Sequence, residues 1–91
     1  MALIFEWDTN KARTNILKHG ISFEEASTVL ADENSITIDD PAHSLREMRS
    51  ITIGLSMRKN VIVAVHTERF GTIRIISARL ASRKERKQYR I

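Results

Sequence analysis

The sequence predicts an α+β fold in which helices pack on one small antiparallel β-sheet. Two segments before residue 32 carry clear helix start signals, and residues 50–57 and 73–79 alternate apolar and polar side chains as strands do, on either side of the apolar run 61–65. The segment 81–91 again has a helical pattern, but it is strongly basic. We expect one domain over residues 1–91, because this length supports a single modest core.

An N-terminal strand and a helix are predicted first. Residues 3–7 alternate as a short strand. Asp8 follows as an N-cap, since its carboxylate can accept hydrogen bonds from the free amides of the first helical turn. The helix is expected over residues 9–19, and Gly20 ends it because glycine tolerates the left-handed conformation.

The second helix has the clearest start signal in the chain. Ser22 and Glu25 stand in the spacing of a capping box, and Phe23, Ala26 and Leu30 follow at helical spacing. This pattern predicts a helix that packs an apolar stripe on the sheet and ends near residues 31–32.

A meander of three to four strands is predicted next, after one loop. The loop covers residues 42–49 and contains His43 and Glu47. Residues 61–65 are apolar on both faces, so they are expected to form a central strand. The other strands are expected at residues 36–38, 50–57 and 73–79, with turns at 58–60 and 68–71.

The last predicted strand carries the strongest functional signal, because it ends in Arg79 beside a basic helix. A guanidinium group presents a planar fork of donors that matches phosphate oxygens. The strand end therefore suggests a phosphate site. Strict alternation predicts one face with Ile73, Ile75, Ser77 and Arg79, and an opposite face with Arg74, Ile76 and Ala78.

Charge is unevenly distributed along the chain. Residues 69–91 hold eight basic side chains and one acidic one, whereas residues 1–68 are slightly acidic. Such a split is typical of a protein that binds nucleic acid, an anionic membrane or an acidic partner, and equally of a solvated surface helix.

No apolar run is long enough for a membrane span, the N-terminus does not resemble a signal peptide, and cysteine is absent. We expect a cytoplasmic protein without disulfides.

No metal or cofactor site is predicted, because His19, His43 and His66 stand alone and no glycine-rich phosphate loop occurs.

RNA cleavage needs neither a metal ion nor a cofactor. The 2′-hydroxyl can attack the adjacent phosphate when a base removes its proton, an acid protonates the leaving 5′-oxygen and cations stabilise the intermediate. The candidate catalytic residues are Arg79 and Arg69 as cations and His66, Glu68 or Tyr89 for proton transfer; the candidate RNA-binding residues are Lys18, His19, Arg74, Arg83 and Arg86.

Each of these residues also has a structural interpretation. Arg79 could form a salt bridge with Glu85 or Glu68, and Arg74 is expected to pair with a carboxylate. Tyr89 could be a buried core residue or a stacking platform for a base.

Several motifs then occur together in one chain. They are Phe5 to Asp8 with Lys11 and Asn15, Lys18 to Ala26, Asp39 to His43, Glu47 and Arg49 ahead of Gly54, His66 to Arg69, and Arg74 to Arg79 with Ala81, Glu85 and Tyr89. As a set they resemble the BrnT family of toxins from bacterial type II toxin–antitoxin pairs, which are related in fold to RelE and ParE toxins.

The resemblance implies an α+β ribonuclease fold and cleavage of RNA that arrests translation and growth. It implies neutralisation by a BrnA-type ribbon–helix–helix antitoxin, expected in a heterotetramer that binds DNA only through the antitoxin. It also assigns roles to Arg79 and Tyr89, as in RelE-like ribonucleases. Two other functions stay open, namely inhibition of a protein target, as by ParE-like toxins, and plain nucleic-acid binding.

Overall fold

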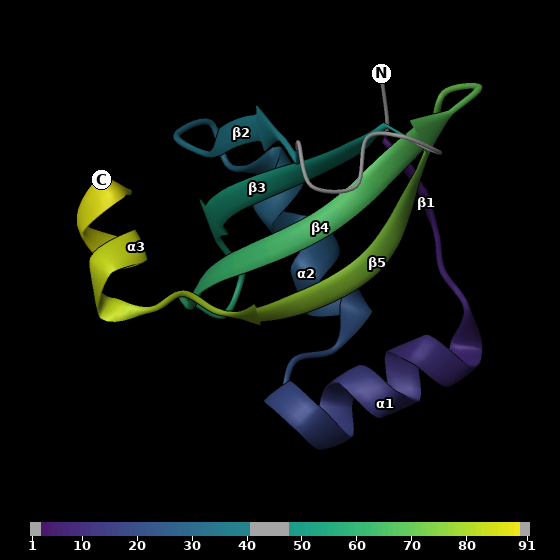
Figure 1. The fold of residues 1–91 in the computed structure, drawn as a ribbon, viewed down its shortest axis with the longest axis horizontal. Coiled ribbons are helices and arrows are strands. Elements are labelled where there is room, and N and C mark those ends of the chain that lie inside the picture. The colour runs from purple at the N-terminus through teal and green to yellow at the C-terminus, as the bar shows by residue number, and fades with distance from the viewer. Residues whose placement is uncertain (1–2, 41–47, 90–91) are drawn as a thin grey trace.

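The computed structural model describes residues 3–40 and 48–89, and its elements follow the predicted order (Figure 1). The predicted loop residues His43 and Glu47 lie outside this described part. The elements are β1 (Ile4–Glu6), α1 (Thr9–His19), α2 (Phe23–Thr28), the 3-10 turn η1 (Val29–Ala31), β2 (Ile36–Asp39), β3 (Arg49–Leu55), β4 (Val61–Arg69), β5 (Thr72–Leu80) and α3 (Arg83–Gln88).

The strands form one five-stranded sheet in the order β1-β5-β4-β3-β2. Strands β2 to β5 are the predicted antiparallel meander, and β4 lies at its centre as its apolar sequence indicated. The α+β fold is thus confirmed. β1, however, pairs with β5 in parallel, so the sheet is mixed rather than purely antiparallel. The local pattern of residues 3–7 identifies a strand but contains no information about its partner.

The first two helices begin at their predicted caps, and α1 ends at Gly20, whereas α2 ends at Thr28 and continues only as the 3-10 turn η1 to Ala31, short of the expected helix end. Asp8 accepts hydrogen bonds from the amides of Asn10 and Lys11 at 2.7 and 3.2 Å. Gly20 ends α1 with a φ of 72°, in the left-handed region. The Ser22 hydroxyl oxygen accepts from the Glu25 amide and starts α2.

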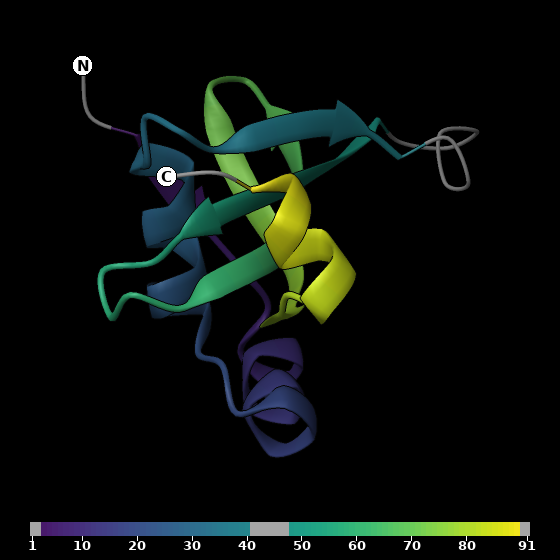
Figure 2. The ribbon, with the colours of Figure 1, turned by 90° about the vertical axis from the view of Figure 1, so that its left-hand side faces the viewer.

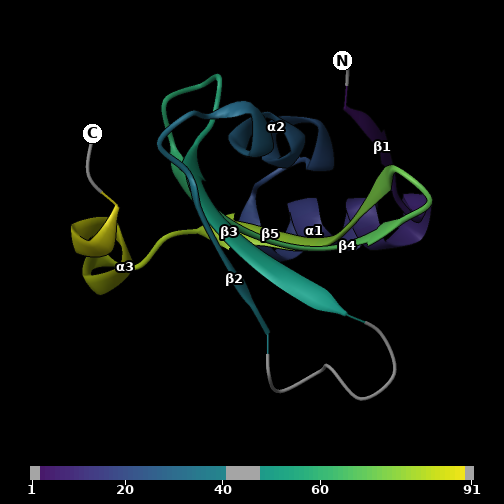
Figure 3. The ribbon, with the colours of Figure 1, turned by 90° about the horizontal axis from the view of Figure 1, so that it is seen from above.

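The hydrophobic core lies between α2 and one face of the sheet. Its helical side includes Phe23, Ala26 and Val29, and its sheet side includes Ile62 and Ala64. Helix α2 covers this side of the sheet, α1 lies along the edge formed by β5, and α3 lies apart from both beyond the end of β5 (Figures 2 and 3). We call the opposite surface of the sheet the open face. None of the helices in the described residues is long and apolar enough to cross a membrane.

A β-bulge in β5 decides which side chains reach the open face. Val65 pairs with Ser77, but the next residue, His66, pairs with Ile75, so Ile76 is an extra residue without a partner on β4. The predicted alternation is therefore wrong beyond Ile75. The bulge places Ala78 in the core with Ile73 and Ile75, and turns Ser77 and Arg79 to the open face that also carries Arg74.

Candidate functional site

A groove of about 390 Å³ lies on the open face, between the strands and α3. We call it the sheet groove. Its floor is apolar, although one floor residue, Ile38, remains 57% exposed. Charged and polar side chains occur around this floor. The lining consists of Ile38, Ile51, Ile53, Val63 and Val65 from the meander, Ser77, Ala78 and Arg79 from β5, Glu85 and Gln88 from α3, and His19 from α1.

Arg79 is held at the edge of this groove by Glu85. Its Nη1 and Nη2 donate to the two oxygens of the Glu85 carboxylate at 2.7 and 2.8 Å. The same carboxylate accepts from the Ser82 amide at 2.8 Å, while the Ser82 hydroxyl accepts from the Glu85 amide, which completes the capping box of α3. One carboxylate therefore starts the helix and orients the guanidinium.

The ion pair fixes the charge of both partners. The hydrogen bond from Arg79 is the main cause that lowers the pKa of Glu85 to about 2, and the same contact raises the pKa of Arg79. Glu85 is therefore a weak base near neutral pH. A guanidinium carries five N–H groups, and Glu85 takes two of them. Within the described residues no hydrogen bond is found on the Nε–H edge of Arg79, whose side chain is 45% exposed. That edge is available to an anion.

His19 lines the same groove from the other direction. It is the last residue of α1, and the left-handed turn at Gly20 ends the helix directly after it. Its imidazole is exposed. The sheet groove therefore combines a guanidinium, a carboxylate and an imidazole from three separate elements.

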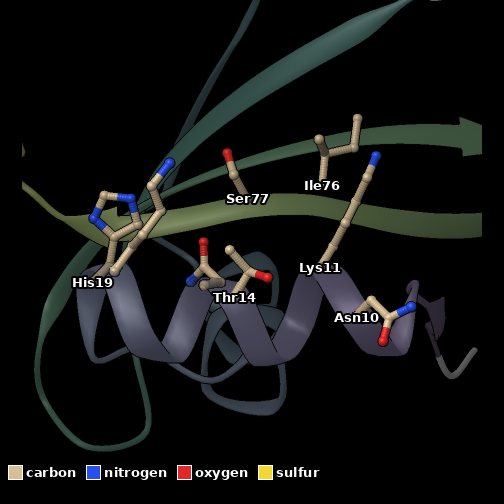
Figure 4. A pocket seen from close by; sticks show the side chains of 8 residues that line it. Asn10, Lys11, Thr14, His19, Ile76 and Ser77 are labelled. Atoms are coloured by element: carbon tan, nitrogen blue, oxygen red, sulfur yellow. The ribbon is translucent and has the colours of Figure 1, made fainter.

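A second groove of about 290 Å³ lies between α1 and β5 (Figure 4). We call it the α1–β5 groove. His19 and Ser77 line both grooves, so the two adjoin each other. The lining residues are Asn10, Lys11, Thr14, Asn15, Lys18, His19, Ile76 and Ser77.

His66, a predicted catalytic residue, is buried on the opposite side of the sheet. It is 7% exposed, and its Nε2 is 2.8 Å from the hydroxyl of Thr52, which in turn bonds to the hydroxyl of Thr37. Burial lowers the pKa of His66, and the Glu68 carboxylate acts in the other direction. The side chain contributes to the packed interior, not to the sheet groove.

Glu68, Arg69 and Arg74 lie at the far end of β4 and β5 from Arg79. Arg79 pairs with Val63, whereas Glu68 is five residues further along β4, roughly 17 Å away in an extended strand. Arg69 and Arg74 line a small cavity of about 130 Å³ with Glu6 and Thr67. Arg74 forms there the predicted pair with a carboxylate, donating to Glu6 at 3.2 Å.

Tyr89 is buried, with 5% of its surface exposed. Its hydroxyl donates to the carboxylate of Asp32, which also accepts from the Leu55 amide at 2.8 Å. Burial is the main cause that raises the pKa of Tyr89 to about 12, and the Asp32 carboxylate adds to it. Tyr89 therefore anchors the end of α3 to the edge of the sheet.

Comparison with known proteins decides the family. A sequence model described as "Ribonuclease toxin, BrnT, of type II toxin-antitoxin system" matches residues 7–85. The chain belongs to the BrnT family. As a toxin of this class it has RNA as its substrate and an antitoxin as its partner. A search among curated proteins gives no significant match.

A solved structure supports the same family. The crystal structure of the Brucella abortus ribonuclease toxin BrnT superimposes with a TM-score of 0.70 at 25% sequence identity, covering 90% of this chain and all of that one. The two proteins thus share the fold over nearly their whole length.

Within this BrnT fold, the predicted site residues separate into distinct places. Arg79 and His19 share the sheet groove, and Lys18 lines the adjoining α1–β5 groove. The predicted RNA-binding residues Arg83 and Arg86 are exposed on α3. The remaining predicted residues, His66, Glu68, Arg69, Arg74 and Tyr89, lie outside both grooves.

Sequence reasoning missed three lining residues, Glu85, Ser77 and Lys11. Glu85 was considered only as a competing salt-bridge partner of Arg79, although its capping-box spacing indicated where its carboxylate lies. Strict alternation predicts Ser77 on the face of Ile73 because it ignores the bulge.

In the described residues no three His, Asp or Glu side chains converge as a metal-ligating cluster.

Proposed function

We propose that this BrnT-family chain cleaves RNA in the sheet groove without a metal ion, by transferring the scissile phosphate to the neighbouring 2′-hydroxyl. One observation carries the proposal: Arg79 and His19, a permanent cation and an imidazole, line a single groove with an apolar floor. These are the two kinds of group that the reaction needs.

Arg79 binds the scissile phosphate in this mechanism. Glu85 occupies one edge of the guanidinium, and the Nε–H edge remains to donate to phosphate oxygens. Negative charge on the phosphate grows when the 2′-oxygen attacks, so a donor already held in place stabilises the transition state more than the ground state. Such a group typically contributes about a hundredfold to a thousandfold in rate.

His19 moves the protons. A bond forms between the 2′-oxygen and phosphorus while the bond from phosphorus to the 5′-oxygen breaks. The 2′-hydroxyl proton passes to a base, and the leaving 5′-oxygen takes a proton from an acid, which leaves a 2′,3′-cyclic phosphate and a 5′-hydroxyl. Imidazole can serve in either step because one ring nitrogen can accept a proton and the other can donate one.

The geometry gives less support to the proton-transfer roles predicted for His66, Glu68 and Tyr89. His66 and Tyr89 are buried with their polar atoms bound to Thr52 and Asp32. Glu68 lies with Arg69 at the far end of the strands. Each would need a rearrangement to reach a phosphate on Arg79.

The apolar floor of the sheet groove suits a nucleobase. Single-stranded RNA exposes its bases, and the face of an unstacked base loses contact with water when it packs on apolar side chains. Isoleucine and valine side chains form this floor, with Val63 directly opposite Arg79 on the neighbouring strand. A base can therefore pack on the strands while its phosphate reaches the guanidinium.

Cleavage of RNA by this site would arrest translation and growth, and the toxin would act in the cytoplasm, where translation takes place. We propose a BrnA-type ribbon–helix–helix antitoxin as the partner, with an acidic segment that covers Arg79 and neutralises its charge. The complex would be a heterotetramer, and its contact with DNA would run through the antitoxin alone.

The reaction is tested with purified protein and RNA in the presence of EDTA. We expect cleavage with 2′,3′-cyclic phosphate ends, and loss of that cleavage in Arg79→Ala. Arg58→Ala is the matched control, because Arg58 is an exposed arginine in the β3–β4 turn, away from both grooves.

RNA that stays intact with and without ribosomes, or cleavage that EDTA abolishes, would contradict the proposed reaction. Intact RNA together with blocked DNA replication in cells expressing the protein would instead indicate inhibition of a protein target.

A further inference from the structure

The α1–β5 groove exists because β1 is much shorter than its neighbour. β1 ends at Glu6, which pairs with Arg74, whereas β5 continues to Leu80. The helix α1 lies along the part of the β5 edge that β1 does not cover. Asn15 takes the place of the missing strand: its amide nitrogen donates to the Ala78 carbonyl at 2.8 Å and its oxygen accepts from the Ala78 amide at 3.1 Å.

Asn15 holds the groove open in a defined shape. The same amide nitrogen also donates to the Ile21 carbonyl at 2.9 Å, so all these bonds are internal and the side chain is only 6% exposed. The helix and the strand edge are therefore fixed relative to each other, and the space between them does not depend on a ligand.

The lining of this groove is cationic. It contains Lys11, Lys18 and His19 and no aspartate or glutamate. Both lysines are exposed, and no ion pair of either one is found in the described part of the chain. Thr14 and Ser77 add neutral hydroxyl groups, and Figure 4 shows them between Lys11 at one end and His19 at the other.

The two lysines are spaced along one side of the helix. They are seven residues apart, which is close to two full turns, or roughly 10 Å along the axis. Two ammonium groups spaced along the groove match a ligand that carries negative charges at intervals along its length better than a small molecule that carries a single negative charge.

The position of the groove specifies the ligand further. His19 and Ser77 belong to both grooves, so an extended chain can leave Arg79 and continue between α1 and β5. We infer that the α1–β5 groove binds the sugar-phosphate backbone of the RNA strand beside the cleaved link, with Lys11 and Lys18 on its phosphates. The inference rests on the proposed ribonuclease function and adds a second binding region to it.

Phosphate contacts of this kind set affinity and register but do not distinguish bases. Lys11 and Lys18 would therefore matter for a long RNA that spans both grooves. A dinucleotide, whose single phosphate is held by Arg79, does not reach them.

The first experiment measures binding with a single-stranded 2′-O-methyl RNA, which lacks the attacking hydroxyl and stays intact. The double variant Lys11→Ala/Lys18→Ala should bind it roughly tenfold more weakly, and the slope of log K against log salt should fall by about 1.4 for two lost contacts. Lys11→Arg/Lys18→Arg should restore most of the affinity, since the charge is kept. Arg13→Ala is the control, because Arg13 is an exposed base on α1 outside the groove.

The second experiment compares substrates of two lengths in cleavage. The double alanine variant should raise KM for a long RNA about tenfold, with kcat and the cleavage of a dinucleotide unchanged. Equal affinity and equal salt slope in the double variant and in Arg13→Ala would overturn the inference. Wild-type protein that binds the 2′-O-methyl RNA through the lysines but cleaves no RNA would instead overturn the proposed ribonuclease site.

Discussion

The two ends of the open face each carry an arginine–carboxylate pair, with two short hydrogen bonds between Arg79 and Glu85 and one longer bond between Arg74 and Glu6. Arg79 pairs with Glu85 at one end and Arg74 pairs with Glu6 at the other, and the two arginine side chains are 45% and 44% exposed. Their surroundings differ. Arg79 borders a groove of about 390 Å³ that also contains His19 and an apolar floor, whereas Arg74 borders a cavity of about 130 Å³ with Arg69 and Thr67. An arginine–carboxylate pair alone therefore does not mark a site; the groups and the space around it do.

The largest expected effect on activity comes from the imidazole of His19, which lines the sheet groove at the Arg79 end of the open face. His19→Ala should lower kcat for RNA cleavage by about a hundredfold or more, because the groove loses the group proposed to transfer protons. His66→Gln should retain most of the activity at neutral pH. The measurement is single-turnover cleavage across a pH series. A His66 variant that is as inactive as the His19 variant while still folded would return the catalytic role to His66.

His66 should instead affect stability in acid. Its pKa is lowered in the folded state, so below about pH 6.5 the unfolded chain binds a proton that the folded chain does not. Folding stability of the wild type therefore decreases as the pH falls through that range, and the loss ends once the folded state is protonated too. His66→Gln has no such group, so its urea midpoint should change less between about pH 7 and 5.

A charge-conserving change separates the two arginines. Arg79→Lys should lower kcat/KM by about tenfold to a hundredfold, because lysine keeps the charge but loses the planar fork that contacts Glu85 and, in the proposed mechanism, the phosphate at the same time. Arg74→Lys should change it by less than about twofold, as expected for an exposed pair outside the groove. Equal losses in both variants would show that the two ends act together on the substrate.

The smallest expected effect concerns the two carboxylates. Glu85→Gln should reduce kcat/KM by a few fold, roughly the cost of misaligning one hydrogen-bonded donor, and Glu6→Gln should leave it unchanged.

Glu85 also stabilises the fold while it is ionised. Its pKa of about 2 means that this stabilisation is complete above pH 4.5 and is lost as the pH falls toward 2. Thermal unfolding of wild type and Glu85→Gln should therefore differ at pH 5 and converge in strong acid.

Much of the fold could be predicted because its signals are local. The side chains of Asp8 and Ser22 start helices by accepting from nearby amides, and Gly20 ends one in the left-handed conformation. The doubly apolar segment 61–65 identified the central strand. The parallel pairing of β1 and the bulge at Ile76 could not be predicted in this way. Both depend on which strand lies alongside, and no periodicity within one segment encodes that.

The candidate site shows the same division between features set by local sequence and features set by tertiary packing. Arg79 is a candidate from the sequence alone because its residue type and its place at a strand end both indicate a phosphate contact. The role proposed for His19 depends on where α1 ends relative to β5, which is a tertiary relation. Tyr89 is buried although the segment around it has no apolar stripe, because the carboxylate of Asp32, distant in sequence, accepts its hydroxyl.

One surplus residue in β5 has a wider consequence. Every side chain after Ile76 points to the opposite surface from the one that a regular strand would give it. The surface that carries Arg79 is thus decided by the number of residues in the strand and not by their identity. In related sequences, a one-residue insertion or deletion at this point would move the equivalents of Ser77 and Arg79 to the other surface even if both residues were kept.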